Sequence, residues 1–253
     1  MLPETASDTR MTETSSEGPS RLGEGDALQR AIARSRRKWA TAGDPGTAEP
    51  PKGTADDKGN RARLGTLLKA VGRRYEHCTL DTFQCQTGEQ RHVVEQLRSY
   101  VDDWHTHRQQ GHGIMAIGGV GGGKDHLLIG AAREIIAAHG DTVRWLSGPQ
   151  LFSQARVHMG KDETAWLGDF LYSAVLILSD PLPPRGGLTD HQAATVQLIV
   201  DERYRHRRAT WVSLNVKDSS EADNRMGSSI VDRLAADALI IKCDWPSWRR
   251  PLG

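Results

Sequence analysis

The chain has 253 residues, of which 37% are hydrophobic, and 33 basic against 32 acidic residues give a formal net charge of +1. This size and composition are typical of one globular domain with an additional polar segment. The balanced charge gives no strong general attraction to polyanions, and the sequence has no run of about 18 apolar residues that would cross a membrane.

Residues 1–60 form the first segment, which is rich in Gly, Pro, Ser, Thr, Asp and Glu and poor in large apolar residues. Such a composition buries too little apolar surface to offset the entropy lost on ordering, so we predict a disordered tail. Its first ten residues include Glu4 and Asp8 and lack the apolar centre of a secretion signal, so we expect a cytoplasmic protein that makes no membrane contact.

Residues 26–40 interrupt this tail with the pattern of a short basic amphipathic helix. Leu28, Ile32 and Trp39 fall near one helical face, and Arg and Lys residues surround them. This helix would dock on a partner protein or on nucleic acid, or it is a solvated basic helix with no fixed partner. The sequence leaves both interpretations open.

Residues 61–253 have a globular composition and open with two helical patterns. Leu64, Leu67 and Val71 share one helical face, and apolar residues recur at helical spacing between Val93 and Trp104. A polar stretch then leads to the first predicted strand, residues 114–117.

A glycine-rich loop follows this strand and precedes a segment with helical spacing. We predict that the loop and the start of the helix bind ATP through Gly118, Gly119, Val120, Gly121, Gly122, Gly123, Lys124, Asp125 and His126. Glycine lets successive backbone N–H groups turn toward a polyphosphate, the helix start adds its positive dipole end, and a lysine reaches the terminal phosphates.

Strand and helix patterns alternate through the rest of the chain. Four further strands are predicted at residues 142–146, 174–180, 209–215 and 239–243, with helices at 150–157 and 189–200 between them. Asp180 ends a continuous apolar run, which is typical of a buried parallel strand. We therefore predict an α/β protein, a three-layer αβα P-loop NTPase with a mainly parallel five-stranded sheet.

Residues 203–208 gather four arginines, Arg203, Arg205, Arg207 and Arg208, around Tyr204 and His206. Such a cluster would neutralise DNA phosphates without reading sequence, although a solvated helix end explains it nearly as well.

From about residue 73 to 250 the chain resembles the DnaC-like helicase loaders and IstB-like transposition helpers among the AAA+ ATPases. The motifs that carry this resemblance are Arg74-Tyr75 to Phe83, the phosphate loop with His126-Leu127, Ser179-Asp180, 188–192, Arg203-Tyr204, 210–215, 230–234 and 245–249.

The resemblance implies a role for each matching residue. Lys124 would hold the β and γ phosphates, Asp180 would polarise the attacking water, and Asn215 would orient that water. Arg233 would reach the nucleotide of a neighbouring subunit, and Arg249 would act as a sensor arginine, both stabilising charge in phosphoryl transfer. The sequence continues only to Gly253, so we expect little or no helical lid.

Two positions depart from the family pattern, which has Thr after the loop lysine and two acids at the end of the third strand. Here Asp125 follows the lysine, and Ser179 precedes Asp180. A carboxylate about 5 Å from a phosphate charge costs ~3 kcal/mol at an effective dielectric near ~20, unless a cation lies between them. We hypothesise an exchange of ligands in which Asp125, Ser179 and Asp180 together serve Mg²⁺.

The resemblance implies an ATP-controlled clamp on a replicative helicase or transposase and on DNA, with possible nucleotide-dependent assembly of identical chains. ATP hydrolysis would then depend on partner or assembly. The alternative is a non-hydrolysing, nucleotide-gated adaptor with a degenerate Mg²⁺ site. A small-molecule kinase is disfavoured, because Asn215 and Arg233 suit assembled ATPases and no acceptor pocket is legible.

Overall fold

The computed structural model describes residues 57–158 and 163–249 of the chain. Helix α2 (Asp57–Val71) begins within the last residues of the segment assigned to the tail. The predicted disorder of residues 1–56 and the predicted basic helix at 26–40 lie outside the described residues, so both stay predictions.

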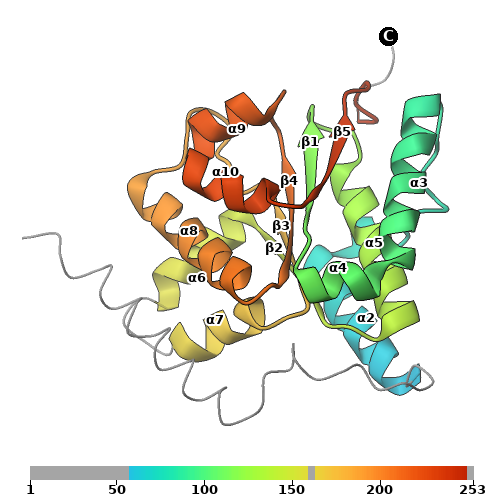
Figure 1. Cartoon of the computed structure of the whole chain (residues 1–253), viewed down its shortest axis with the longest axis horizontal. Helices are drawn as coiled ribbons and strands as arrows, with labels where there is room; N and C mark the ends of the chain where they lie inside the picture. The colour runs from blue at the N-terminus through green and yellow to red at the C-terminus, as the bar shows by residue number, and fades with distance from the viewer. Residues whose placement is uncertain (1–56, 159–162, 250–253) are drawn as a thin grey trace, which may run out of the picture.

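A five-stranded parallel sheet forms the centre of the domain, with strand order β2-β3-β4-β1-β5 (Figure 1). The strands are β1 (Ile114–Gly118), β2 (Val143–Ser147), β3 (Val175–Ser179), β4 (Ala209–Leu214) and β5 (Leu239–Cys243). All five predicted strands are present, and the parallel sheet is confirmed. Because the strands are parallel, their carboxyl ends meet at one edge, where β1 leads into the glycine-rich loop.

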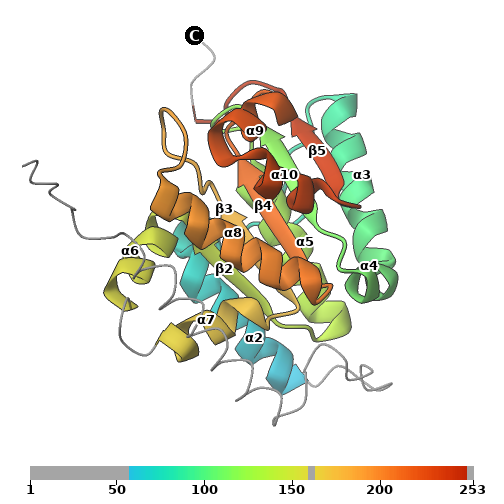
Figure 2. The same cartoon turned by 60° about the vertical axis from the view of Figure 1, so that its left-hand side comes forward.

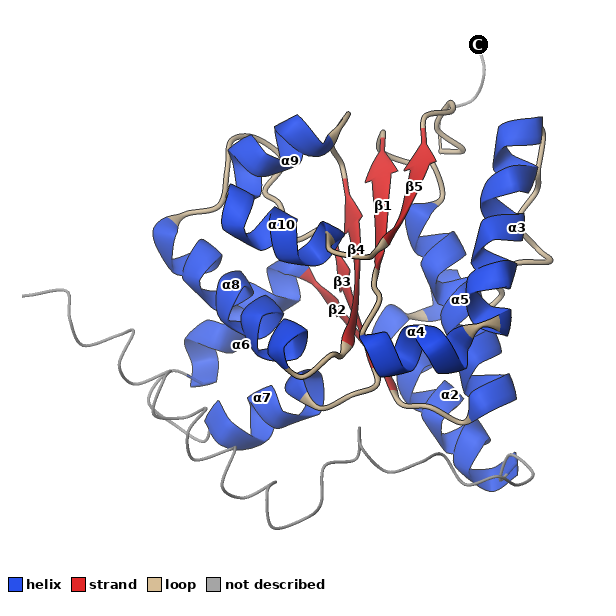
Figure 3. Ribbon diagram, viewed as in Figure 1, coloured by secondary structure: helices blue, strands red, loops and turns tan. Residues whose placement is uncertain are grey.

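Helices cover both faces of the sheet, as Figures 1, 2 and 3 show. One layer contains α2, the 3-10 helix η1 (Arg73–Tyr75), α3 (Gly88–Asp102), α4 (Trp104–Gln110) and α5 (Lys124–His139). The other layer contains α6 (Gly148–His158), α7 (Glu163–Leu171), α8 (Asp190–Arg205), α9 (Ser219–Met226) and α10 (Ser228–Ala235). This arrangement is the predicted three-layer αβα fold.

Alternation of side chains along the strands divides the core into two clusters. Ile114 and Ala116 of β1 pack with α2, α3 and α5, whereas Met115 and Ile117 pack with the helices of the opposite layer. The side chains of β1 are buried on both faces, as expected of a central strand in a parallel sheet.

Four α-helices in the described part of the chain were not predicted, namely α4, α7, α9 and α10. The polar stretch before β1 contains α4, which buries Trp104 and leaves most of its other side chains exposed or half-buried. Helices α7 and α9 have nine and eight residues, too few for a clear helical period. Start signals were more informative, since a capping box of Thr189 and Gln192 begins α8, where a helix was predicted at 189–200.

None of the helices in the described part of the chain is both long enough and apolar enough to cross a membrane.

Candidate functional site

The glycine-rich loop runs from the carboxyl end of β1 into the first turn of α5. Gly118 and Gly123 have φ angles of 140° and 84°, which favour glycine. A Cβ atom on Gly118 would lie 2.4 Å from the carbonyl oxygen of Cys243, and one on Gly123 would lie 2.7 Å from the Phe83 ring. The course of this loop therefore requires glycine at both positions, and it ends at a helix N-terminus suited to phosphate.

A segment after β5, residues 244–249, holds this loop in place. The backbone N–H of Trp248 donates a hydrogen bond to Gly121 O at 3.1 Å. The indole N–H of Trp245 donates to Gly122 O at 2.7 Å, across 123 positions of sequence. Both indole rings lie 6.3 Å from the ring of Phe83, centroid to centroid. The segment thus fixes two loop carbonyls and packs on the same aromatic side chain.

Lys124 is the first residue of α5, and its side chain is only 6% exposed. Its ammonium group donates to Gly118 O at 2.8 Å, to Gly119 O at 2.7 Å and to Asn215 Oδ1 at 2.9 Å. Burial lowers the pKa of Lys124, whereas nearby acidic groups, among them Asp125 and Asp180, act to raise it. Since an ammonium group has three donors, an arriving phosphate must replace at least one of these acceptors.

Asp125 follows in the first turn of α5, and two serine hydroxyls hold its carboxylate. Ser179 Oγ lies 3.0 Å from each carboxylate oxygen, and Ser213 Oγ donates to Oδ1 at 2.7 Å. Ser179 and Ser213 are register partners at the ends of β3 and β4, and both are buried. Two hydroxyl donors and the positive end of α5 therefore stabilise this carboxylate.

Asp180 lies directly after β3 with a φ angle of 47°, in the left-handed region. Its carboxylate accepts a hydrogen bond from Asn215 Nδ2 at 2.6 Å. Burial raises the pKa of Asp180, and the charge of Asp125 raises it further. The side chain of Asn215 therefore joins Lys124 through its oxygen to Asp180 through its nitrogen.

These groups line a cavity of about 400 Å³ at the carboxyl edge of the sheet. Its lining residues are Arg74, Tyr75, Cys78, Thr82, Phe83, Gln84, Val120, Gly121, Gly123, Lys124, Asp125, His126, Asp180, Ser213, Asn215, Trp248 and Arg249. The volume lies in the range of ordinary small-molecule sites, and its composition pairs a polar floor with an aromatic wall. The donor set of Lys124 and the helix N-terminus fits a polyphosphate.

The residues predicted to bind Mg²⁺ are brought together, with Ser179 packed against Asp125 outside the cavity lining. Within residues 57–158 and 163–249, no group of three or more His, Cys, Asp or Glu side chains is placed to hold a metal ion alone. Phosphate oxygens or waters would have to complete the coordination, which is usual for Mg²⁺. The residues therefore fit a metal ion that arrives with a nucleotide.

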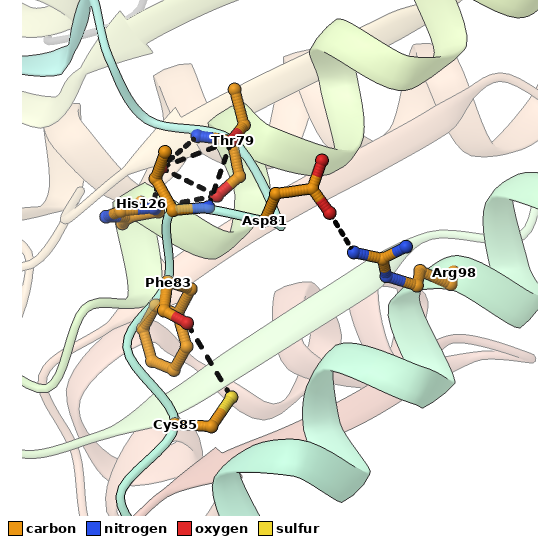
Figure 4. Close-up of polar contacts among 7 residues, drawn as sticks. Thr79, Asp81, Phe83, Cys85, Arg98 and His126 are labelled. Atoms are coloured by element: carbon orange, nitrogen blue, oxygen red, sulfur yellow. Dashed lines mark hydrogen bonds and ion pairs between the residues drawn. The ribbon is translucent and has the colours of Figure 1, made fainter.

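Residues 75–84, here called the strap, cross the start of α5 and form one wall of the cavity. His126 Nε2 lies 2.9 Å from Thr79 O, and the ring of Phe83 meets the ring of His126 edge-on (Figure 4). Asp81 pairs with Arg98, which anchors the strap to α3 (Figure 4). Burial lowers the pKa of His126, and the contact of its ring with Thr79 O joins the strap to the helix that follows the loop.

The two predicted arginines lie in different places. Arg249 lines the cavity. Arg233 does not line it; its Nε lies 2.9 Å from Asp201 Oδ1, and its guanidinium donates to Ser229 O at 2.7 Å. The structure therefore does not bring Arg233 to the nucleotide cavity of its own chain.

The arginine cluster at 203–208 is not one surface, and this part of the DNA hypothesis was wrong. Arg203 is fully buried and donates to the carbonyl oxygens of Phe170, Ser173 and Ala209 at 2.6, 3.0 and 2.7 Å. Arg208 is 6% exposed. The guanidinium groups of Arg203 and Arg208 therefore lie inside the domain and not on its surface. Arg205 and Arg207 remain exposed.

The aromatic wall of Tyr75, Phe83 and Trp248 was not predicted as part of the site, and neither were Ser213 and Arg225. Ser213 lies two positions before Asn215, so strand alternation would have placed both on the same face. Arg225 of α9 donates to Asn215 O at 3.2 Å, to Pro183 O at 2.5 Å and to Gly186 O at 2.9 Å. It thus ties the loop after β3 to the end of β4, and no sequence pattern signals this.

Comparison with known proteins agrees with this geometry. A family model described as IstB-like ATP binding protein matches residues 60–251. The crystal structure of the DnaC helicase loader is similar with a TM-score of 0.63 and 24% identity, over 68% of this chain and 99% of that one. A putative primosome component from Streptococcus pyogenes serotype M3 gives a TM-score of 0.60 and 19% identity, over 77% and 100%.

The replication initiator DnaA bound to AMPPCP and single-stranded DNA is also similar, with a TM-score of 0.56 and 18% identity, over 70% of this chain and 51% of that one. No curated protein matches the sequence. At identities below 25%, these solved structures show a fold shared with this chain, and the matching family model is described as ATP binding.

Proposed function

The chain belongs to the family of IstB-like ATP binding proteins, and from this membership we propose that it acts as an ATP-controlled clamp of the helicase-loader type. The observation that carries the proposal is the cavity in which the phosphate loop, Lys124, Asp180, Asn215 and Arg249 meet. These side chains come from α5, the ends of β3 and β4, and the segment after β5, so four parts of the fold contribute to one cavity.

The triphosphate would lie on the loop and the first turn of α5. Lys124 would exchange its contacts with Gly119 O and Asn215 for contacts with the β and γ phosphates. The tight packing of Gly118 and Gly123 keeps the loop narrow enough for backbone N–H groups to approach the phosphates. Tyr75, Phe83 and Trp248 form the wall on which the base would rest.

Asp125, Ser179 and Asp180 are the residues proposed to hold Mg²⁺. The bound ion would supply positive charge that offsets the like charges of Asp125 and the triphosphate. The hydroxyl of Ser179 would keep the Asp125 carboxylate in place, since it already contacts both oxygens.

Hydrolysis would require a water molecule oriented by Asp180 and Asn215. In this structure Asn215 binds both Lys124 and Asp180. A γ phosphate that takes over the contact with Lys124 would release Asn215 Oδ1, and this oxygen could then accept a hydrogen bond from the attacking water. Asn215 would thus respond to the presence of the third phosphate.

Assembly of identical chains would bring Arg233 to a neighbouring nucleotide. Support comes from its position, because Arg233 lies outside the cavity of its own chain while Arg249 lies inside it. A cation supplied across an interface adds charge stabilisation only after assembly, so we propose hydrolysis that depends on assembly or on a partner.

The alternative is a nucleotide-gated adaptor that does not hydrolyse ATP. Two observations favour it: the carboxylate of Asp125 faces the cavity beside Lys124, and Asp180 is held by Asn215. Binding of ATP would then be normal, and no phosphate would be released even when partner and DNA are present.

The proposed partner is a replicative helicase or a transposase, together with DNA bound without sequence preference. The names of the similar structures support this choice, since they include a helicase loader and an initiator bound to single-stranded DNA. The predicted basic helix at residues 26–40 is the proposed contact with the protein partner.

Calorimetry with ATP, ADP and Mg²⁺ tests the proposal at the level of the nucleotide. The wild-type chain is expected to bind both, and Lys124→Ala is expected to bind each about 100-fold more weakly, a loss of ~2.7 kcal/mol. Lys242→Ala is the matched control, because Lys242 is exposed on β5 and does not line the cavity.

Recovery of partners from the native cell, with wild-type and Lys124→Ala protein as bait, tests the clamp. A helicase or transposase retained only by the wild-type protein in ATP is the expected result. Equal retention by both baits would contradict control by ATP.

A further inference from the structure

Ser213 contacts both acidic residues of the site. Its hydroxyl donates to Asp125 Oδ1 at 2.7 Å. The backbone N–H of Asp180 donates to Ser213 O at 3.0 Å and lies 3.3 Å from Ser213 Oγ. Ser213 is only 2% exposed, yet it borders the cavity. One serine therefore fixes a carboxylate of α5 and the backbone that carries the carboxylate after β3.

The parallel register of β3 and β4 creates this arrangement. Ser179 and Ser213 are Cα partners, so their side chains leave the sheet on the same face and at the same level. Both hydroxyls reach Asp125 on the helix above. Oδ1 accepts from both serines, whereas Oδ2 has contact with Ser179 alone. The unequal contacts define one orientation of the carboxylate.

We propose that Ser213 is a positioning residue for the metal ion, an inference that rests on the proposed function. Its hydroxyl holds Oδ1 of Asp125 in an orientation in which the carboxylate can bind Mg²⁺. Without this contact the carboxylate could turn toward the phosphates and repel them. Asp125 is a larger, charged residue at the position where the family pattern has a threonine hydroxyl. We therefore propose that one donor, Ser179, is not enough to fix the orientation of this carboxylate and that a second donor is needed. Ser213 supplies that donor.

Ser147 shows that a serine at this level of the sheet does not by itself make the contact. It ends β2 as the register partner of Ser179 on the other side, and its hydroxyl donates to Gln150 Oε1 at 3.0 Å. Ser147 is thus a matched control: it has the same residue type, the same strand end and a different acceptor.

The test compares the affinity for ADP in Mg²⁺ with the affinity in EDTA, measured by calorimetry. For Ser213→Ala we expect the enhancement by Mg²⁺ to fall about tenfold, or ~1.4 kcal/mol. The affinity in EDTA should change less than about twofold, because the phosphate contacts remain. Ser147→Ala should keep the full enhancement, and thermal melting without nucleotide establishes that each variant is folded.

A double-mutant cycle separates positioning from a general loss of structure. In an Asp125→Asn background, Ser213→Ala should have no further effect on the Mg²⁺ enhancement, because the carboxylate that Ser213 orients is gone. Equal enhancement in Ser213→Ala and wild type would overturn the inference. The inference would also be overturned if Ser213→Ala lost the same affinity for ADP in Mg²⁺ as in EDTA, or if the wild type bound ADP equally well in both. Failure of the wild type to bind any adenine nucleotide would instead reject the proposed function.

Discussion

The hydroxyl of Ser179 lies 3.0 Å from each carboxylate oxygen of Asp125, so a hydroxyl and a carboxylate bridge β3 and α5. The resembled family pattern has the same two groups in the opposite places, with the hydroxyl on the helix and the carboxylate on the strand. This contact is the geometry that the hypothesis of exchanged Mg²⁺ ligands requires.

Reversing the pair again is the first prediction. Asp125→Thr with Ser179→Asp should keep Mg²⁺-dependent nucleotide affinity within about threefold of the wild type, since Mg²⁺ accepts either oxygen from either side. Ser179→Asp alone should place the new carboxylate beside that of Asp125. Their repulsion should weaken Mg²⁺-free nucleotide binding by ~3 kcal/mol at an effective dielectric near ~20. Calorimetry with and without Mg²⁺ measures the nucleotide affinity of each variant. A double variant that binds nucleotide more weakly than Asp125→Thr alone and Ser179→Asp alone would contradict the exchange.

The second prediction concerns Arg233. Because this side chain lies outside its own cavity, Arg233→Ala should leave nucleotide affinity unchanged and lower ATP turnover in the assembled protein by roughly 10³-fold. Phosphate release is measured in the presence of partner and DNA.

A mixture of Arg233→Ala and Lys124→Ala chains supplies the control. Mixed assemblies contain sites in which Lys124 of one chain and Arg233 of its neighbour are both intact. The mixture should therefore hydrolyse ATP faster than either variant alone. Full turnover by Arg233→Ala alone would show that the residue has no part in the reaction.

The third prediction concerns the buried Arg203. Arg203→Met should lower the free energy of unfolding by roughly 3–5 kcal/mol, because several buried carbonyl oxygens would lose their donor. Arg207→Ala should cost less than about 1 kcal/mol, since its side chain is exposed. Urea denaturation measures both, and similar costs for the two variants would show that the carbonyl contacts add little.

The fourth prediction concerns Arg225. Arg225→Met removes the donors to Pro183 O and Gly186 O, so amide hydrogen exchange in residues 181–188 should rise about tenfold. Exchange in β4 should change little, because its ladder hydrogen bonds remain. Glu221→Gln is the control, since it leaves the guanidinium contacts with both loop carbonyls in place. An unchanged rate in the loop would mean that other contacts hold it.

The sequence predicted those parts of the fold that depend on local pattern. The strand ending at Asp180 is a continuous apolar run, and Thr189 with Gln192 is a complete start signal for a helix, so both were found. Short helices such as α9 have too few turns for their period to be read. Their positions follow from packing against the sheet, which local pattern does not contain.

In the candidate site, residues on the loop and at strand ends were predicted, because motif order and strand direction bring them to one edge. The contacts of Arg225 depend on how α9 packs, and no spacing encodes them. The burial of Arg203 was hidden for the same reason: an arginine at the start of an arginine-rich stretch gives the pattern of a solvated surface, and only the carbonyl oxygens around it show otherwise.

The bonds from Trp245 and Trp248 to the phosphate loop have a consequence for biosynthesis. More than a hundred residues separate the loop from these partners, so a ribosome has long finished the loop before it adds them. Strand β5, the neighbour of β1, also emerges late. The phosphate loop of a nascent chain therefore lacks both of these hydrogen bonds until translation has passed Trp248.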